Sequence, residues 1–195
     1  GFVGNIGKDD YDAFALNITF TDTASYGTVV GSASSNGNTG GFAGIFINCA
    51  SDSKITRAYS RAEVKGMVSA GGFAGVIDST NLKISQAYAA GSVIPLDFST
   101  TFAGGFIGYY ANGEFENCYW DTMKTGQSQA VVGGYSPPGI TGLSTGDMHT
   151  KNKYDGWSIG NTSSHSGTNW IMDSAVNNEY PYPVTFYELW GADVP

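Results

Sequence analysis

The sequence predicts an all-β fold: a parallel β-solenoid (β-helix) of about four coils, closed by an irregular C-terminal cap that contains a short helix. The phrase Gly-Gly-Phe-x-Gly occurs three times, and its phenylalanines are spaced by 31 residues (73 − 42) and 33 residues (106 − 73). A second segment, which ends in a small residue and a tyrosine, keeps step with it. Such self-similarity means that each copy buries its apolar face only by stacking on its neighbours.

Solenoid coils fit this repeat better than helical hairpins or propeller blades. The chain holds 28 glycines in 195 residues and is rich in tyrosine and phenylalanine, a composition that disfavours helices. A propeller blade needs about 40–50 residues and four strands, which is more than these units hold. A coil of short strands with glycine corners, rising about 4.8 Å per coil, suits the observed period.

The repeated motif also sets the expected coils, which lie near residues 1–40, 41–71, 72–104 and 105–120. The first copy is partial, Gly1-Phe2-Val3-Gly4, and its longer distance to Phe42 predicts an insertion. We expect Phe42, Phe73 and Phe106 to stack on one another inside the lumen, because equivalent positions of successive coils lie one rung apart.

The segment around the repeated Ala-Tyr pair is expected to form a second wall. Successive side chains of a strand alternate faces, and a charged residue cannot face the lumen, so Ala58 and Ala87 should point inward in register. The same alternation places Tyr59, Tyr88 and Tyr119 on the outer face. We expect these tyrosines to form an exposed ladder that either stiffens the sheet or binds a ligand.

The third complete copy departs from this pattern at its end. Cys118 continues the small-residue wall, but Trp120 stands where the earlier coils have Ser60 and Ala89. An open solenoid end exposes its core and its strand edge, so a large ring is expected on a terminal coil. We therefore expect residues 121–195 to form the cap and tail, with a short capped helix beginning after Ser144.

The combination of these motifs resembles the GLUG-repeat family of large bacterial surface proteins. The resemblance covers roughly Gly40 to Phe186 and rests on Gly-Gly-Phe-x-Gly followed by Ala58-Tyr59 or Ala87-Tyr88. It also rests on a closing segment similar to the usual end of such arrays: Asn117-Cys118-Tyr119-Trp120-Asp121-Thr122, Gly126-Gln127, Met148, Gly156-Trp157, Trp170 and Tyr180-Pro181-Tyr182. Such repeats are similar to parts of adhesins and of IgA-cleaving metalloproteases. The resemblance implies a β-solenoid stalk and carries no catalytic residues over to this chain.

Charge and composition restrict the partners. The net charge of −8 and the pI near 4.4 argue against nucleic-acid binding, which needs a basic stripe. No run of 18 apolar residues and no secretory leader is recognisable, so we expect no membrane span in this segment. We expect a secreted or cell-surface location. Because the chain starts within a motif, we expect it to be cut or processed from a longer parent chain with further repeats or domains.

The two cysteines are expected to be free. The repeat places Cys49 and Cys118 at different points of coils two rungs apart, about 9–10 Å along the axis. A disulfide needs Cα atoms within about 7 Å, so we expect two buried thiols.

Catalytic and metal motifs are weak. The Gly156–Gly160 segment matches Gly-x-Ser-x-Gly at Ser158, but no histidine follows its downstream acid Asp173, as a nucleophile elbow requires. His149 and His165 are expected to be loop residues. Asp9, Asp10 and Asp12 form either a solvated acidic loop, which their spacing favours because it is not that of an EF-hand, or a calcium site with oxygen ligands. We expect no other cofactor.

The sequence leaves three function classes open. The first is a structural or adhesive segment that acts as a stalk or attaches to a host cell, a neighbouring cell or a matrix. The second is a carbohydrate-binding module that uses Tyr59, Tyr88 and Tyr119. The third is a polysaccharide-active enzyme, for which clustered carboxylates and basic residues are needed. Arg61 and Glu63 are together on one rung only, so the sequence favours a protein that is not an enzyme.

Overall fold

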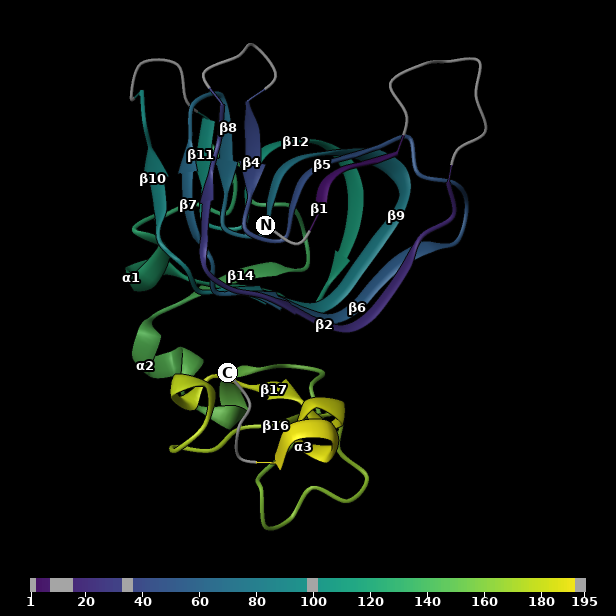
Figure 1. Ribbon diagram of the computed structural model, residues 1–195, viewed down its shortest axis with the longest axis vertical. Helices are drawn as coiled ribbons and strands as arrows, with labels where there is room; N and C mark the ends of the chain where they lie inside the picture. The colour runs from purple at the N-terminus through teal and green to yellow at the C-terminus, as the bar shows by residue number, and fades with distance from the viewer. Residues whose placement is uncertain (1–2, 8–15, 33–36, 98–101, 192–195) are drawn as a thin grey trace. The chain divides into compact units, whose positions relative to one another are not determined.

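The protein is described by a computed structural model that defines residues 3–7, 16–32, 37–97 and 102–191. It divides into two compact units, Gly1–Leu143 and Ser144–Pro195. The first is a parallel β-solenoid of about three turns, which confirms the predicted fold class (Figure 1). Among the described residues, no helix is long and apolar enough to cross a lipid bilayer.

The solenoid wall consists of four columns of stacked strands. The broad column runs through β1 (Val3–Gly7), β5 (Ala43–Ile47), β9 (Ala74–Ala89) and β12 (Ile107–Glu116). The second contains β2 (Thr19–Ser25), β6 (Ser53–Ser60), the end of β9, β13 (Cys118–Asp121) and β14 (Ile140–Leu143). Two narrow columns hold β3 (Thr28–Val30), β7 (Glu63–Gly66) and β10 (Val93–Pro95), and β4 (Asn38–Gly40), β8 (Ser69–Gly71) and β11 (Phe102–Gly104). Every strand pair of the solenoid is parallel.

The interior stacks as the repeat predicts. The ring centroids of Phe42 and Phe73 lie 4.8 Å apart, those of Phe73 and Phe106 lie 4.9 Å apart, and the rings of each pair are stacked with nearly parallel planes. Ala58 pairs in register with Ala87, and both are fully buried. These columns confirm the predicted register, because identical core residues occupy one site on successive rungs.

A left-handed residue bends each coil at the same place. Asp22, Arg57, Gln86 and Asn117 have φ angles of 55°, 54°, 51° and 53°. Asp22 and Arg57 occupy equivalent positions, as the register of β2 and β6 shows. A single residue of this kind resets the alternation of faces, as in a β-bulge, and turns the strand around the corner. The repeat therefore encodes its bend with Asp, Arg, Gln or Asn rather than with glycine.

The solenoid continues past the predicted boundary at residue 120. Strand β14 pairs with β13 and brings Gly142 opposite Trp120, and Phe106 donates its backbone N–H to the Ala130 carbonyl. Trp120 is therefore not the plug of a terminal coil, although it is buried. A Cβ on Gly105 or Gly142 would collide with its ring, so glycines on two neighbouring segments make room for it. The first compact unit extends to Leu143, and the short helix α1 (Thr122–Thr125) belongs to it.

The second unit is small and held together by aromatic residues. Its elements are α2 (Thr145–Met148), η1 (Lys151–Lys153), β15 (Ile159–Gly160), β16 (Trp170–Ile171), η2 (Asn177–Glu179), β17 (Tyr182–Pro183) and α3 (Val184–Trp190). The rings of Trp157 and Trp170 stack 4.1 Å apart. The Ser144 side chain accepts a hydrogen bond from the Asp147 N–H, which confirms the predicted helix cap.

Both cysteines are free and buried, as expected. The Cys118 thiol lies 3.4 Å from the Ile84 carbonyl oxygen, to which it donates. Burial raises the pKa of Cys118 to about 12, because the thiolate would lose its hydration inside the wall. Cys118 therefore acts as a small apolar residue rather than as a nucleophile.

Candidate ligand-binding groove

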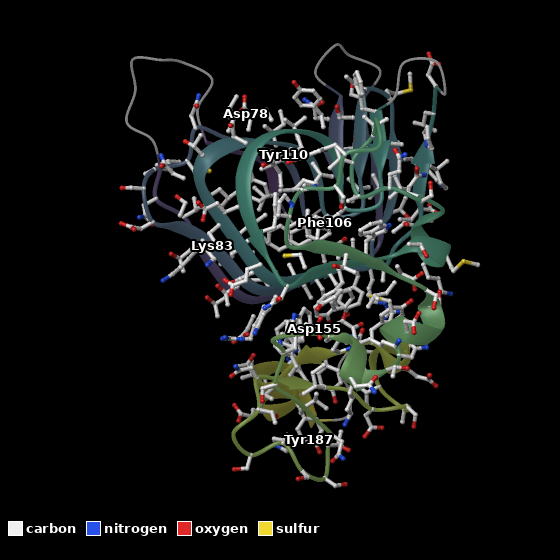
Figure 2. The ribbon with its side chains drawn as sticks, turned by 180° about the vertical axis from the view of Figure 1, so that it is seen from behind. Asp78, Lys83, Phe106, Tyr110, Asp155 and Tyr187 are labelled. Atoms are coloured by element: carbon white, nitrogen blue, oxygen red, sulfur yellow. The ribbon has the colours of Figure 1, made fainter. Side chains whose placement is uncertain are left out.

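The outer face of the wall formed by β6, β9 and β12 carries two columns of polar side chains. In the first column Lys54 pairs with Lys83, and Lys83 pairs with Glu114. In the second column Thr21, Thr56, Ser85 and Glu116 occupy equivalent positions. Ile55 and Ile84, which alternate with these residues, point into the core. The polar columns therefore lie outside, as Figure 2 shows for Lys83 compared with Phe106 in the interior.

A groove of about 360 Å³ opens on the first of these columns. Its lining comes from the turn residue Asp52 and from strands β6, β9 and β12, which contribute Ser53, Lys54, Thr80, Asn81, Leu82, Lys83 and Glu114. Apart from Ser53 and Leu82, these residues are exposed. We call this feature the lysine groove. It offers two ammonium groups, an amide, one exposed hydroxyl and two carboxylates to a ligand that lies along the wall.

The lining carries two cations, Lys54 and Lys83, and two carboxylates, Asp52 and Glu114. The Lys83 ammonium lies 2.6 Å from a carboxylate oxygen of Glu116, and this hydrogen bond raises the pKa of Lys83. Lys83 therefore stays protonated at neutral pH. Lys54 forms no ion pair within the described part of the chain. The groove thus presents one cation that is already paired and a second that can meet an anionic group.

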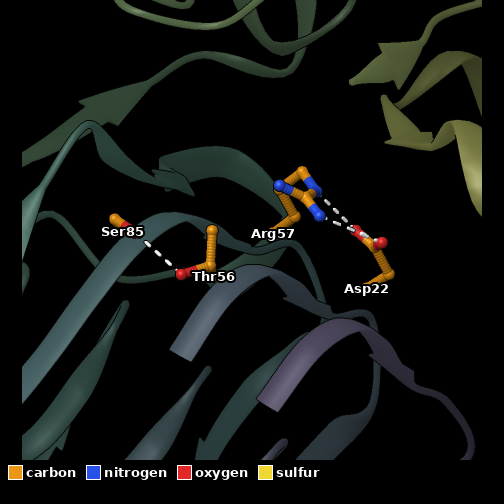
Figure 3. A network of polar contacts seen from close by, with 4 residues as sticks. All are labelled: Asp22, Thr56, Arg57 and Ser85. Atoms are coloured by element: carbon orange, nitrogen blue, oxygen red, sulfur yellow. Dashed lines mark hydrogen bonds and ion pairs between the residues drawn. The ribbon is translucent and has the colours of Figure 1, made fainter. Parts of the chain in front are cut away.

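The polar contacts beside the groove hold the bend of the coil (Figure 3). Arg57 forms two contacts with Asp22, Nε to Oδ1 at 2.5 Å and Nη2 to Oδ2 at 3.1 Å. The hydroxyls of Thr56 and Ser85 lie 3.3 Å apart on neighbouring rungs. Both residues of the ion pair are mostly buried, with 23% and 15% of their side chains exposed. Arg57 and Asp22 are themselves the left-handed residues of two neighbouring rungs, and their ion pair joins the two bends. They support the groove rather than line it.

The predicted tyrosine ladder exists, but it is not an exposed surface. The rings of Tyr59 and Tyr88 stack 4.8 Å apart, and Tyr119 pairs in register with Tyr88. Their exposed fractions are 0%, 0% and 4%. The Tyr26 ring meets Tyr59 edge to face, and their hydroxyls are hydrogen bonded. The prediction that these tyrosines face solvent is wrong, because alternation gives the direction of a side chain and not what covers it.

Of the predicted charged pair, Glu63 begins strand β7 and Arg61 precedes it. Glu63 pairs with Lys65 at 2.7 Å, and that contact lowers the pKa of Glu63. Arg61 lies over the Tyr26 ring at 5.8 Å. Asp9, Asp10 and Asp12 lie outside the described residues, so the calcium prediction stays untested. Among the residues that the structure does describe, no three His, Cys, Asp or Glu side chains are grouped as metal ligands.

The remaining catalytic motif lacks the geometry of a nucleophile elbow. Ser158 is followed directly by strand β15 rather than by a helix. His149 contacts Glu179 at 3.3 Å, and His165 contacts the Asn161 carbonyl oxygen at 3.2 Å. Neither of these contacts joins a histidine to Ser158.

The lysine groove was missed by the sequence analysis, although a signal for it exists. Lys54-Ile55 and Lys83-Ile84 precede the Ala-Tyr pair at the same distance, and Glu114-Phe115 takes their place in the next coil. A repeated charged residue followed by a core residue indicates an outward column. The other lining residues, such as Asp52 and Thr80, do not recur from coil to coil, so the groove itself could not be predicted.

Comparison with known proteins gives no relative from which function could be transferred. No protein-family model matches the chain, and neither a curated protein nor a solved structure does.

Proposed function

We propose that this chain is a structural and adhesive segment of a secreted or cell-surface protein, and that its lysine groove binds an anionic polymer of a cell surface or matrix. A rigid stack of coils suits a stalk, because each coil adds a fixed rise and the same outer face. The resemblance to GLUG repeats agrees with this role, and membership of that family stays a prediction.

The observation that carries the proposal is the pairing of Lys54 with Lys83 on neighbouring rungs inside the groove. Like charges directly opposite each other on a sheet are destabilising. Folding does not require this arrangement, since Thr19 and Glu114 occupy the same column on the outer rungs. Because Lys83 is already paired with Glu116, Lys54 is the cation of the column that an anionic ligand would meet.

Two other functions are less well supported. Carbohydrate binding by Tyr59, Tyr88 and Tyr119 would require rings that are accessible, and these are buried. A polysaccharide-active enzyme has candidate carboxylates in Glu114 and Glu116. Both acids are exposed, and Glu116 is held by Lys83, so we favour binding over catalysis.

The test is binding of polygalacturonate and dextran sulfate to the whole chain, with uncharged dextran as the comparison. We expect the double variant Lys54→Met/Lys83→Met to bind the anionic polymers at least tenfold more weakly at low salt. Lys65→Met is the matched control, because Lys65 points outward on β7 and is already paired with Glu63. Wild-type affinity should fall as salt is raised. Equal binding by the double variant and the control would refute the role of the groove.

A further inference from the structure

A second feature of the outer wall is a pair of aromatic rings on β11 and β12, the strands that follow β8 and β9 in their columns. Phe102 on β11 and Tyr109 on β12 meet across the glycine corner, with ring centroids 6.0 Å apart at an interplanar angle of 67°. Each residue is 45% exposed. Two large rings half in solvent on an outer corner form a platform that the interior of the solenoid does not use.

The repeat itself shows that these rings are not needed for stacking. Phe102 stands on the column of Asn38 and Ser69, and Tyr109 on the column of Ile45 and Val76. The preceding rungs therefore build the same corner without an aromatic residue. The interior columns, by contrast, keep phenylalanine on each of the three rungs. The rings at 102 and 109 are a local addition to the outer face.

A polar pair lies next to this platform on the same face. Asn112 on β12 donates from Nδ2 to Asp78 Oδ1 on β9 at 2.9 Å. The register slips between Tyr110 and Asn112, so that Tyr110 packs against the core while Asn112 comes opposite Asp78. A bulge of this kind re-aims a side chain. Figure 2 shows Asp78 on the outside of the wall.

The spacing brings the polar pair within reach of a ligand on the aromatic platform. Tyr109 pairs with Val76, and Asp78 is the next residue of β9 that points to the same face. Two positions along a strand and one rung across correspond to about 8 Å. This is the scale of one sugar ring, with the aromatic face under its C–H groups and the amide and carboxylate at its hydroxyls.

We propose that Phe102, Tyr109, Asp78 and Asn112 form a binding subsite for an uncharged sugar residue of a glycan. The Asp78 carboxylate selects against acidic sugars, since a second carboxylate or sulfate there would be repelled. The Asp78 carboxylate accepts a hydrogen bond from a sugar hydroxyl. The side-chain carbonyl oxygen and the second N–H of Asn112 remain for further hydrogen bonds. The subsite is separate from the lysine groove, which takes anionic groups.

The experiment is an NMR or calorimetric titration of the whole chain with uncharged hexasaccharides, namely β-1,4-linked glucose, mannose, xylose and N-acetylglucosamine oligomers. At least one should bind, and Tyr109→Ala should weaken its binding tenfold or more. Asn112→Ala should weaken it about threefold to tenfold. Tyr135→Ala is the matched control, because Tyr135 is also half exposed but stacks on Tyr110.

Each outcome separates this subsite from the lysine groove. Loss of hexasaccharide binding in Tyr109→Ala, with polygalacturonate binding unchanged, supports the subsite whatever the groove does. Failure of every hexasaccharide to bind at 10 mM overturns it. Equal weakening by Tyr135→Ala and Tyr109→Ala also overturns it, and so does loss of hexasaccharide binding only in Lys54→Met/Lys83→Met.

Discussion

The interior and the exterior of the solenoid follow different rules. Inside, the same residue recurs on successive rungs, as in the column of Phe42, Phe73 and Phe106. Outside, the columns change along the stack: Lys54 and Lys83 give way to Glu114, and Val76 gives way to Tyr109. A residue that recurs in the lumen is required for stacking, while a residue that changes on the wall is free to serve recognition. This contrast places the residues that stabilise the fold and those that we propose to bind ligands on opposite faces of the same strands.

The largest expected effect comes from breaking an interior column. Phe73→Ala removes the middle ring of the stack, which is fully buried and contacts a ring on each side. We expect a loss of about 3–5 kcal/mol in the free energy of unfolding, from the lost burial and the cavity that remains. Urea denaturation followed by circular dichroism measures it. Tyr109→Ala, an aromatic truncation on the outer face, is the comparison and should cost about 1 kcal/mol or less.

The glycine corners should be the next most sensitive positions. A Cβ on Gly72 would lie 2.3 Å from the Gly105 carbonyl oxygen, a backbone atom that cannot move aside cheaply. We expect Gly72→Ala to destabilise the fold by about 1–3 kcal/mol through overpacking. Gly4→Ala is the control, because nothing lies within 4 Å of its added Cβ. Similar melting temperatures for the two variants would show that the corner tolerates a side chain.

The pH dependence of the free energy of unfolding tests how tightly the wall around Cys118 is packed. The pKa of Cys118 in the folded protein, about 12, lies above its ordinary value of 9.0, so the fold favours the neutral thiol. The resulting stability is fully present below pH 9 and is lost as pH rises toward 12, by up to about 1.4 kcal/mol per pH unit. Cys118→Ala should lack this part of the pH dependence. If wild type and variant lose stability in parallel between pH 9 and 11, the thiol is accessible and the wall is less tightly packed.

The sequence predicted the interior well and the surface poorly, for a physical reason. The phenylalanine columns and the Ala58–Ala87 register followed from a fixed period, since stacked copies must place equivalent core residues together. The burial of Tyr59 and the extension of the solenoid to β14 depend on segments without a repeat. The lysine groove likewise includes residues that do not recur between coils, such as Asp52 and Thr80. A repeat predicts the positions of residues that recur on every coil, and it gives no information about segments that occur only once.

The smallest expected effect distinguishes the two lysines of the groove. Lys54→Met removes one of two like charges on neighbouring rungs and should raise stability by about 0.2–0.5 kcal/mol. Lys83→Met also relieves the repulsion, but it leaves Glu116 without the ion pair at 2.6 Å, so it should be neutral or slightly destabilising. The difference should shrink at 1 M salt, where exposed charges are screened. Precise chemical denaturation at low and high salt measures it. If both variants are destabilised equally at low salt, the lysine column contributes to folding, and the division between a stabilising interior and a recognition surface fails at this site.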